Sequence, residues 1–201
     1  MPQQFNIDRL TASLLQPAEI ALGQANDAAV AAVLMSTDEG TSALLIRRGE
    51  HPQDPWSGHM AFPGGRKEAR DESLLITAQR ETYEEVGLDL SQHATLLGAL
   101  SPVPAIAGGE RAGFSITPFV FLLHTEQPLV LDSSEVHEAL WAALDPLCRG
   151  VGRTQHVYAH KGAQRELPAF DIEGRVVWGL TFHMLLGLLR LGSGQIFDFN
   201  K

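Results

Sequence analysis

The sequence predicts a mixed α/β domain in which a mixed β-sheet is sandwiched between α-helices. Three observations predict this class: apolar strand-like segments in both halves of the chain, an amphipathic helix near the middle, and another near the C-terminus. A length of 201 residues suits one compact domain with a sizeable core. No internal repeat, low-complexity tract or linker divides the chain, so we expect a single domain.

The first half of the chain combines one broken helix with short strands. Residues 7–21 read as a helix with a break near Pro17, and 28–35 and 42–48 read as strands joined by the turn "STDEGT". The short strand "HMAFPGG" follows a loop rich in Pro and Asp. A longer helix then begins between 71 and 74 and ends at Gly87, where glycine suits a C-cap.

The second half is richer in strands. "HATLLGALSPV" and "GFSITPFVFLL" read as strands around a glycine-containing loop, while "EVHEALWAAL" fits strand or helix. "HVYAH…LPAFDIEGRVVWG" indicates a hairpin, and "WGLTFHMLLGLLRL" a final amphipathic helix in which Trp178 is expected to close the core. We therefore divide the chain into a helical segment packed on the domain (1–27), the domain (28–192) and a tail (193–201).

Composition excludes several classes of function. With 15 Lys and Arg against 24 Asp and Glu, the net charge is −9, which argues against general binding to nucleic acid or to an anionic membrane. Cys148 is the one cysteine, so neither an intramolecular disulfide nor a cysteine-based zinc cluster can form. We expect no secretory signal, because the first residues lack a cationic start that leads into an apolar run, and the longest apolar stretch, 176–189, is shorter than the ~20 residues that span a bilayer. A cytoplasmic protein is expected, and a homodimer stays open.

The segment "RETYEEVGL" (80–88) carries three glutamates on one side of the predicted helix. At 100° per residue from Glu81, Glu84 lies at about 300° and Glu85 at about 40°. The side between about 100° and 220° is expected to face the core and holds Leu75, Ile76, Thr82, Tyr83 and Val86. Carboxylates this close repel each other, so the stripe is either a solvated acidic face or a cation site.

The glycines before this helix favour the cation site. "PGG" at 63–65 lets the backbone turn sharply and leaves the carbonyls of Gly64 and Gly65 unshielded. A glycine carbonyl with three carboxylates is an all-oxygen donor set, which Mg²⁺ and Mn²⁺ prefer and zinc does not. A bound cation would also give this acidic chain the positive charge that an anionic substrate requires.

The segment "GGRKEARDESLLITAQRETYEEVGL" resembles the Nudix box: a glycine, a glutamate, then Arg-Glu-x-x-Glu-Glu-x-Gly and an apolar residue. It departs from the pattern at Thr82, usually apolar, and has one extra residue between Gly65 and Glu72. The resemblance implies a Nudix fold that hydrolyses a nucleoside diphosphate linked to another moiety. It implies that Mg²⁺ or Mn²⁺ is held by Glu81, Glu84 and Glu85, with a carbonyl of Gly64 or Gly65. Arg80 would orient Glu81, and Glu72 would support Arg80 or the metal waters.

Two regions of the chain offer a candidate for the general base. Glu81 is preferred, because a glutamate on the stripe can take a proton from a metal-bound water. In this superfamily the base can instead come from a loop, and Glu135 is the main alternative, with Glu138 behind it. Either of these two could equally be an ordinary surface acid.

The region before the box is similar to the coenzyme A pyrophosphatase branch of this superfamily. "ALLIRRGEHPQDPWSGHMAFPGGR" (43–66) has the Leu-Leu, the arginine at Arg48, the later glycine and the Phe-Pro-Gly-Gly of that branch. It lacks the branch's second arginine, for which Gln53 or His51 could substitute. The resemblance implies cleavage of coenzyme A or its thioesters to 3′,5′-ADP and 4′-phosphopantetheine. ADP-ribose, another nucleotide-sugar or an oxidised nucleotide is the alternative substrate, and a non-catalytic nucleotide sensor the alternative function.

Three residues near this region are candidate substrate contacts, and the partner they imply is a small nucleoside diphosphate derivative. Arg48 matches the branch arginine. His59 could reach a substrate phosphate or be a structural histidine, and Trp56 could stack on a base or pantetheine arm or fill a rim pocket.

Overall fold

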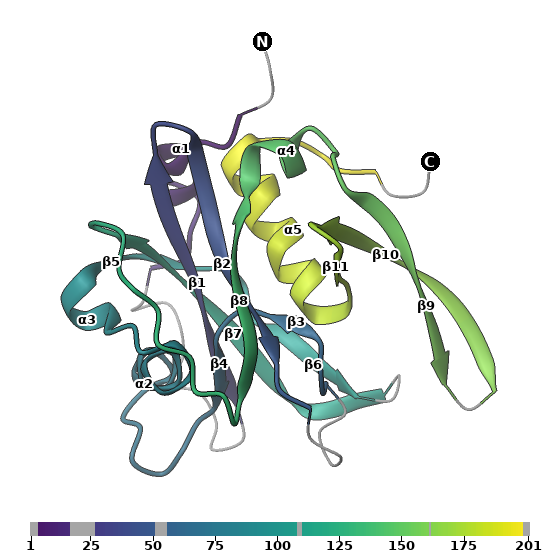
Figure 1. The fold of residues 1–201 in the computed structure, drawn as a ribbon, viewed down its shortest axis with the longest axis horizontal. Coiled ribbons are helices and arrows are strands. Elements are labelled where there is room, and N and C mark those ends of the chain that lie inside the picture. The colour runs from purple at the N-terminus through teal and green to yellow at the C-terminus, as the bar shows by residue number, and fades with distance from the viewer. Residues whose placement is uncertain (1–3, 17–26, 51–55, 108–109, 161, 199–201) are drawn as a thin grey trace.

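The structure is a computed structural model that describes residues 4–16, 27–50, 56–107, 110–160 and 162–198 (Figure 1). Its helices are α1 (Ile7–Thr11), α2 (Leu74–Val86), α3 (Leu90–His93), α4 (Leu144–Cys148) and α5 (Gly179–Ser193). Its strands are β1 (Ala28–Thr37), β2 (Gly40–Arg48), β3 (Met60–Ala61), β4 (Gly64–Arg66), β5 (Ala94–Ala99), β6 (Val103–Ala107), β7 (Glu110–Leu123), β8 (Val136–Ala143), β9 (Arg153–His160), β10 (Ala163–Ile172) and β11 (Arg175–Val177). His51, Gln53 and residues 17–21 of the expected N-terminal helix lie outside the described residues, and the described part of that helix ends at Thr11.

The main sheet is mixed and lies between helices, which confirms the predicted fold class. Its central order is β3-β2-β1-β7-β5, with β4 paired to β1, β6 to β7 and β8 to β2. The β1–β7 pair is parallel and the other pairs are antiparallel. Figure 1 shows α2 on one face of this sheet and α5 on the other. A second sheet, β11-β10-β9, stands beside α5.

Strand β1 is apolar from Ala28 to Leu34 because both of its faces are covered there. Ala29, Ala31 and Val33 pack in the cluster that contains α2 residues. Val30, Ala32 and Leu34 alternate with them and pack in the cluster that contains α5 residues. A strand buried on two sides reads as a continuous apolar run, which explains the segment "AAVAAVLM".

Helix α2 has the expected ends. The Ser73 side chain accepts a hydrogen bond from the Ile76 N–H at 3.3 Å and caps the first turn. Gly87 follows Val86 in the left-handed conformation, with φ 70°, and its N–H donates to the Tyr83 carbonyl. The predicted start between 71 and 74 and the predicted end at Gly87 are therefore confirmed.

The buried side of α2 was only partly predicted. Thr82 is buried as expected, and its hydroxyl donates to the Ala78 carbonyl at 2.7 Å. Ile76 and Tyr83, expected in the core, are 41% and 59% exposed. Glu85, expected on an open acidic face, is 2% exposed. The reason is that β4 runs beside α2 and covers its carboxylate side, so the buried arc is rotated toward the glutamates.

Other segments resolve or correct the sequence interpretation. The ambiguous segment 135–144 is strand β8, which leads directly into α4. Trp178 does not close the core: it is half-buried just before α5 and contacts His156 and Tyr158 of β9. Across the described ranges no helix is long and apolar enough to traverse a bilayer.

The N-terminal segment is tied to the end of α5. The Asn6 N–H donates to the Gly192 carbonyl at 3.1 Å, and Arg9 Nη1 donates to the Ser193 carbonyl at 2.6 Å. The Phe5 ring fills the space where a side chain at Gly192 would lie. Gly192 is therefore required for close packing of Phe5 against α5.

Two glycines of α5 give a test of this contact. Gly192→Ala is expected to lower the free energy of unfolding by about 1–3 kcal/mol, because a Cβ there overlaps the Phe5 ring. Gly187→Ala, on the same helix, is the control: its Cβ would lie 3.9 Å from Leu100, and alanine should raise stability by about 0.5–1 kcal/mol. Urea unfolding measures both free energies. Equal effects of the two substitutions would contradict the requirement for glycine at position 192.

Candidate active site

Glu85 of α2 is buried directly beneath the glycine turn. Its Oε2 accepts a hydrogen bond from the Gly64 N–H at 2.7 Å, and its Oε1 lies 3.9 Å from Arg48 Nη1. Gly64 has φ 147°, and any side chain there would overlap the Ala29 carbonyl and Val30. Burial raises the pKa of Glu85 to about 8, an effect opposed by the Gly64 hydrogen bond and the charge of Arg48.

Glu81, one turn before Glu85, lies against the next glycine. A Cβ at Gly65 would come within 2.6 Å of the Glu81 carboxylate, so only glycine leaves room for that group. Burial raises the pKa of Glu81, and the negative charges of Glu84 and Glu135 add to the rise, while Arg80 opposes it. Both carboxylates therefore gain from a nearby positive charge.

Arg80 connects the helix to the preceding loop. Its Nε and Nη2 bind both oxygens of Asp71, each at 2.9 Å, and Nη2 also donates to the Arg66 carbonyl at 3.1 Å. Its Nη1 lies 3.0 Å from Glu81 Oε1 and 2.8 Å from Glu84 Oε2. Arg80 thus lies beside Glu81, where the resemblance places it.

Asp71, rather than Glu72, supports Arg80. Asp71 is 3% exposed, and besides Arg80 it accepts hydrogen bonds from the Thr77 hydroxyl at 3.0 Å and the Glu68 N–H at 2.8 Å. The bidentate contact with Arg80 holds the pKa of Asp71 well below its usual range. Glu72 is exposed and makes no contact with Arg80 among the described residues. The contact with Arg80 that was expected of Glu72 is made by Asp71, whereas support of the metal waters by Glu72 stays a prediction.

Glu84 occupies the solvent side of the acidic stripe. It is paired with Arg70 Nη2 at 3.0 Å as well as with Arg80. As placed, no three His, Cys, Asp or Glu side chains of the described ranges converge on one point. The donor set still fits a hard divalent cation, because the charge of Glu81 helps to raise the pKa of Glu85 and the Gly65 backbone adjoins Glu81. Glu81 and Glu85, with Glu84 at the rim, would hold the ion.

The two alternative bases lie in different surroundings. Glu135 precedes β8 and is exposed, and its charge raises the pKa of both Glu81 and Glu85, so it faces the same site. Glu138 forms an ion pair with Arg175 of β11. Glu138 alternates with Ala139 and Trp141, which pack with the α2 cluster, so it points away from the stripe. The structure therefore keeps Glu135 as an alternative and removes Glu138.

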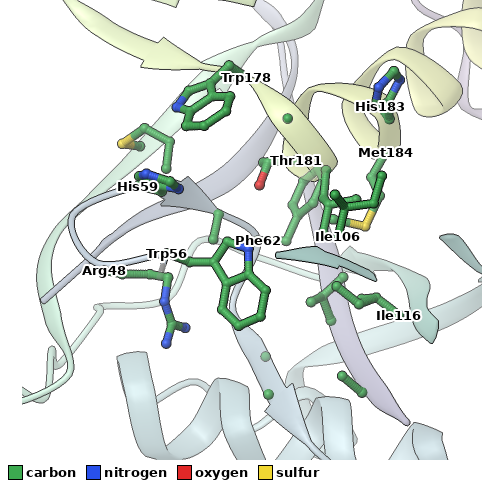
Figure 2. Close-up of a pocket in the computed structure, with 18 of the residues that line it drawn as sticks. Arg48, Trp56, His59, Phe62, Ile106, Ile116, Trp178, Thr181, His183 and Met184 are labelled. Carbon is green, nitrogen blue, oxygen red and sulfur yellow. The ribbon is translucent and has the colours of Figure 1, made fainter. Parts of the chain in front are cut away.

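A cavity of about 690 Å³ opens beside the glycine turn. Figure 2 shows Arg48, Trp56 and His59 along one side of it and Ile106, Ile116 and Met184 along another. Gly64 and Gly65 belong to its wall, so the cavity begins at the carboxylate pair. All three candidate substrate contacts, Arg48, Trp56 and His59, lie in this wall.

The aromatic residues of the cavity are held by packing. Trp56 meets Phe114 edge-on at 6.5 Å and packs near Ala28 and Ala105, so it fills the rim while lining the cavity. His59 lies edge-on to Trp178, with 4.8 Å between ring centroids. The Arg66 guanidinium lies 3.3 Å from the centre of the Phe114 ring.

Sequence reasoning missed several residues of the site. Asp71 was missed because the motif names its neighbour, Glu72, which has a similar acidic side chain. Trp178, Tyr158 and Thr181 line the cavity but come from a hairpin and a helix far from the motif in sequence. The long-range pairing of these elements carries no local sequence signal.

Comparison with known proteins decides the family. The sequence profile of the NUDIX domain matches residues 25–165. The chain belongs to the Nudix family. The family match covers α2, the glycine turn and most of the cavity wall.

Relatives share part of their length with this Nudix chain. It is 31% identical over 147 residues to "Uncharacterized Nudix hydrolase NudL" of Yersinia pestis (strain Pestoides F), which covers 69% of this chain and 66% of that protein. It is 44% identical over 106 residues to "Uncharacterized protein C14C4.10c" of Schizosaccharomyces pombe, which covers 52% of this chain and 32% of that protein. The chain therefore spans from about a third to about two thirds of the length of these relatives.

Solved structures agree on the fold. The Nudix hydrolase RenU of M. smegmatis superposes with a TM-score of 0.55 at 16% identity, covering 94% of this chain and 98% of that one. A binary complex of the C. elegans Ap4A hydrolase superposes with a TM-score of 0.50 at 18% identity, covering 62% of this chain and 84% of that one. At these identities the likeness establishes the Nudix fold.

Neighbouring acids of the loop test the support of Arg80. Asp71→Asn is expected to lower the free energy of unfolding by about 2–4 kcal/mol, because it leaves the mostly buried Arg80 without its bidentate partner. Glu72→Gln is the matched control and should stay within about 0.5 kcal/mol of the unsubstituted chain. Urea unfolding compares the two variants. A larger loss of unfolding free energy in Glu72→Gln than in Asp71→Asn would show that Glu72 supports Arg80, as the resemblance implied.

The raised pKa of Glu85 predicts a pH dependence of stability in metal-free buffer. The folded carboxyl keeps its proton up to about pH 8, whereas the unfolded one releases it near 4.5. The folded state therefore binds more protons between these values, and stability falls as pH rises, by at most about 1.4 kcal/mol per pH unit from this group. Glu85→Gln should remove that component of the slope. Unfolding measured from pH 5 to 8 with chelator checks it, and parallel curves would contradict the assignment.

Proposed function

We propose that this chain is a Mg²⁺- or Mn²⁺-dependent hydrolase that cleaves the diphosphate of coenzyme A or its thioesters, releasing 3′,5′-ADP and 4′-phosphopantetheine. The observation that supports the proposal most is the buried pair Glu81 and Glu85 against the glycine turn, at the edge of a large cavity. Family membership supports the hydrolysis, and the cavity and the region before the box support the substrate.

A few residues of the site have defined parts in the proposed reaction. A bound divalent cation would lower the pKa of a water and offset the charge of the diphosphate. Glu81 accepts the proton of the attacking water, with Arg80 held 3.0 Å from its Oε1 to fix its position. Glu135, whose charge reaches the same site, is the alternative acceptor. Arg48, at the cavity wall beside Glu85, binds a phosphate oxygen.

The cavity supports a substrate with an extended, partly apolar arm. Ile106, Ile116 and Met184 form an apolar wall opposite His59 and Trp56 (Figure 2). A pantetheine arm has methyl and methylene groups that such a wall can cover, whereas the second ribose of ADP-ribose presents hydroxyl groups over most of its surface. All three stripe glutamates are present, which argues against a non-catalytic sensor.

A substrate panel tests the function. Coenzyme A, acetyl-coenzyme A and ADP-ribose are each incubated with the protein and Mg²⁺ in ¹⁸O-labelled water, and mass spectrometry identifies the products and the labelled phosphate. Turnover of the coenzyme A compounds above ADP-ribose is expected. Rapid turnover of ADP-ribose beside none of coenzyme A would contradict the substrate, and no turnover of any would contradict the activity.

Substitution of Glu81 tests its proposed role as the general base. Glu81→Gln should lower kcat about 10²–10⁴-fold, because the amide cannot take the proton and no longer balances a cation. Glu138→Gln, at a residue that points away from the stripe, is the control, and steady-state assays with Mg²⁺ compare the two variants. A Glu81→Gln variant with normal kcat would transfer the role of base to Glu135.

A further inference from the structure

The N-terminus of α5 opens into the cavity without a capping group. Trp178 is the N-cap residue and its side chain makes no capping hydrogen bond, and no acidic residue lies in the first turn of the 15-residue helix. Gly179, Leu180 and Thr181 of this turn all line the cavity. The first N–H groups of a helix lack partners within the helix, and the helix dipole makes this end positive. The terminus is therefore suited to an acceptor or an anion, but needs independent support.

The Thr181 side chain supplies that support. Thr181 is 8% exposed, and its hydroxyl has no hydrogen-bond partner among the described residues. Thr181 lies in the first turn of α5, so the residue four positions earlier is Val177 of β11 and no helical carbonyl is available to its hydroxyl. Figure 2 shows the Thr181 oxygen turned toward the interior of the cavity. A buried hydroxyl without a partner is costly, so a ligand acceptor is expected to complete it.

The charge of the cavity wall indicates that this ligand is an anion. Among the described residues the wall contains three arginines and one glutamate, namely Arg48, Arg66, Arg165 and Glu110. The whole chain carries a net charge of −9, so the cavity reverses the sign of the protein locally. Arg48 and Gly64 mark the end of the cavity at the carboxylate pair, whereas Thr181 belongs to α5 on the opposite face of the sheet from α2. The wall thus has two separate places for negative charge.

An aromatic surface adjoins the α5 terminus. The Trp178 indole stacks on His156, with 4.1 Å between centroids and 23° between planes, and Tyr158 lies 5.3 Å away. Trp178 and Tyr158 line the cavity whereas His156 does not, so His156 backs the indole from outside. Desolvation lowers the pKa of His156, which favours the neutral ring in this stack. A planar group beside a phosphate site is the arrangement that a nucleotide requires.

We propose that the first turn of α5, with the Thr181 hydroxyl, binds a phosphomonoester of the substrate that is distinct from the diphosphate cleaved at Glu81 and Glu85. The inference rests on the proposed function and narrows it to nucleoside diphosphate derivatives that carry an additional phosphate, such as the 3′-phosphate of coenzyme A. A substrate that lacks this phosphate leaves the Thr181 hydroxyl and the turn N–H groups without an acceptor, so the site selects against it.

The kinetic test compares coenzyme A with 3′-dephospho-coenzyme A, which differ by this phosphate alone. The unsubstituted chain should favour coenzyme A in kcat/KM by about tenfold or more. Thr181→Val keeps the side-chain shape but removes the hydroxyl, and the preference should fall about tenfold, mainly through KM. Thr181→Ser restores a hydroxyl and should keep the preference. An unchanged preference in Thr181→Val, or no preference in the unsubstituted chain, would overturn the inference.

A binding measurement separates this inference from the proposed hydrolysis. Calorimetric titration with adenosine 3′,5′-bisphosphate and with 5′-AMP gives a ratio of affinities that does not depend on turnover. The bisphosphate should bind more tightly to the unsubstituted chain, and Thr181→Val should reduce the ratio about tenfold. Equal affinities in the unsubstituted chain would overturn the subsite even if coenzyme A is hydrolysed. Absence of hydrolysis with the ratio as expected would contradict the proposed function alone.

Discussion

The site depends on the contact between two glutamates of one helix and the backbone of two consecutive glycines. Gly64 donates its N–H to Glu85, and the missing side chain of Gly65 leaves space for the Glu81 carboxylate. This contact buries groups that prefer to be charged in water, which is why the pKa of each is raised. Two carboxylates in such a place favour either a bound proton or a bound cation, and a divalent cation would compensate both charges at once.

Two arginines beside the stripe form ion pairs with its acidic side chains. Arg80 is shared between Asp71, Glu81 and Glu84, and Arg70 reaches Glu84 from the loop. Because Asp71 binds Arg80 through two hydrogen bonds, the guanidinium is fixed before any ligand arrives. The positive wall of the cavity lies on the other side of the glycine turn. The proposed metal site and the proposed substrate site therefore adjoin each other at Arg48, which lines the cavity and lies 3.9 Å from Glu85.

The sequence predicted the elements of the fold better than the surroundings of the site. The two-sided burial of β1 and the ends of α2 follow from local patterns, a continuous apolar run in one case and Ser73 and Gly87 in the other. Helical periodicity predicted Tyr83 in the core and Glu85 outside it. The periodicity contains no information about β4, which covers the carboxylate side of the helix. Thr181 reaches the cavity only through the packing of α5 across the sheet. These contacts join elements that are far apart in the sequence, so no local sequence pattern predicts them.

We propose that Glu81 and Glu85 hold a divalent cation beside the glycine turn. Anomalous diffraction from crystals grown with Mn²⁺ tests it most directly, because manganese is located without reference to any assumed ligand. An anomalous peak is expected within coordination distance of Glu81 and Glu85. A crystal with full exposure to Mn²⁺ and no peak at these two carboxylates would contradict it.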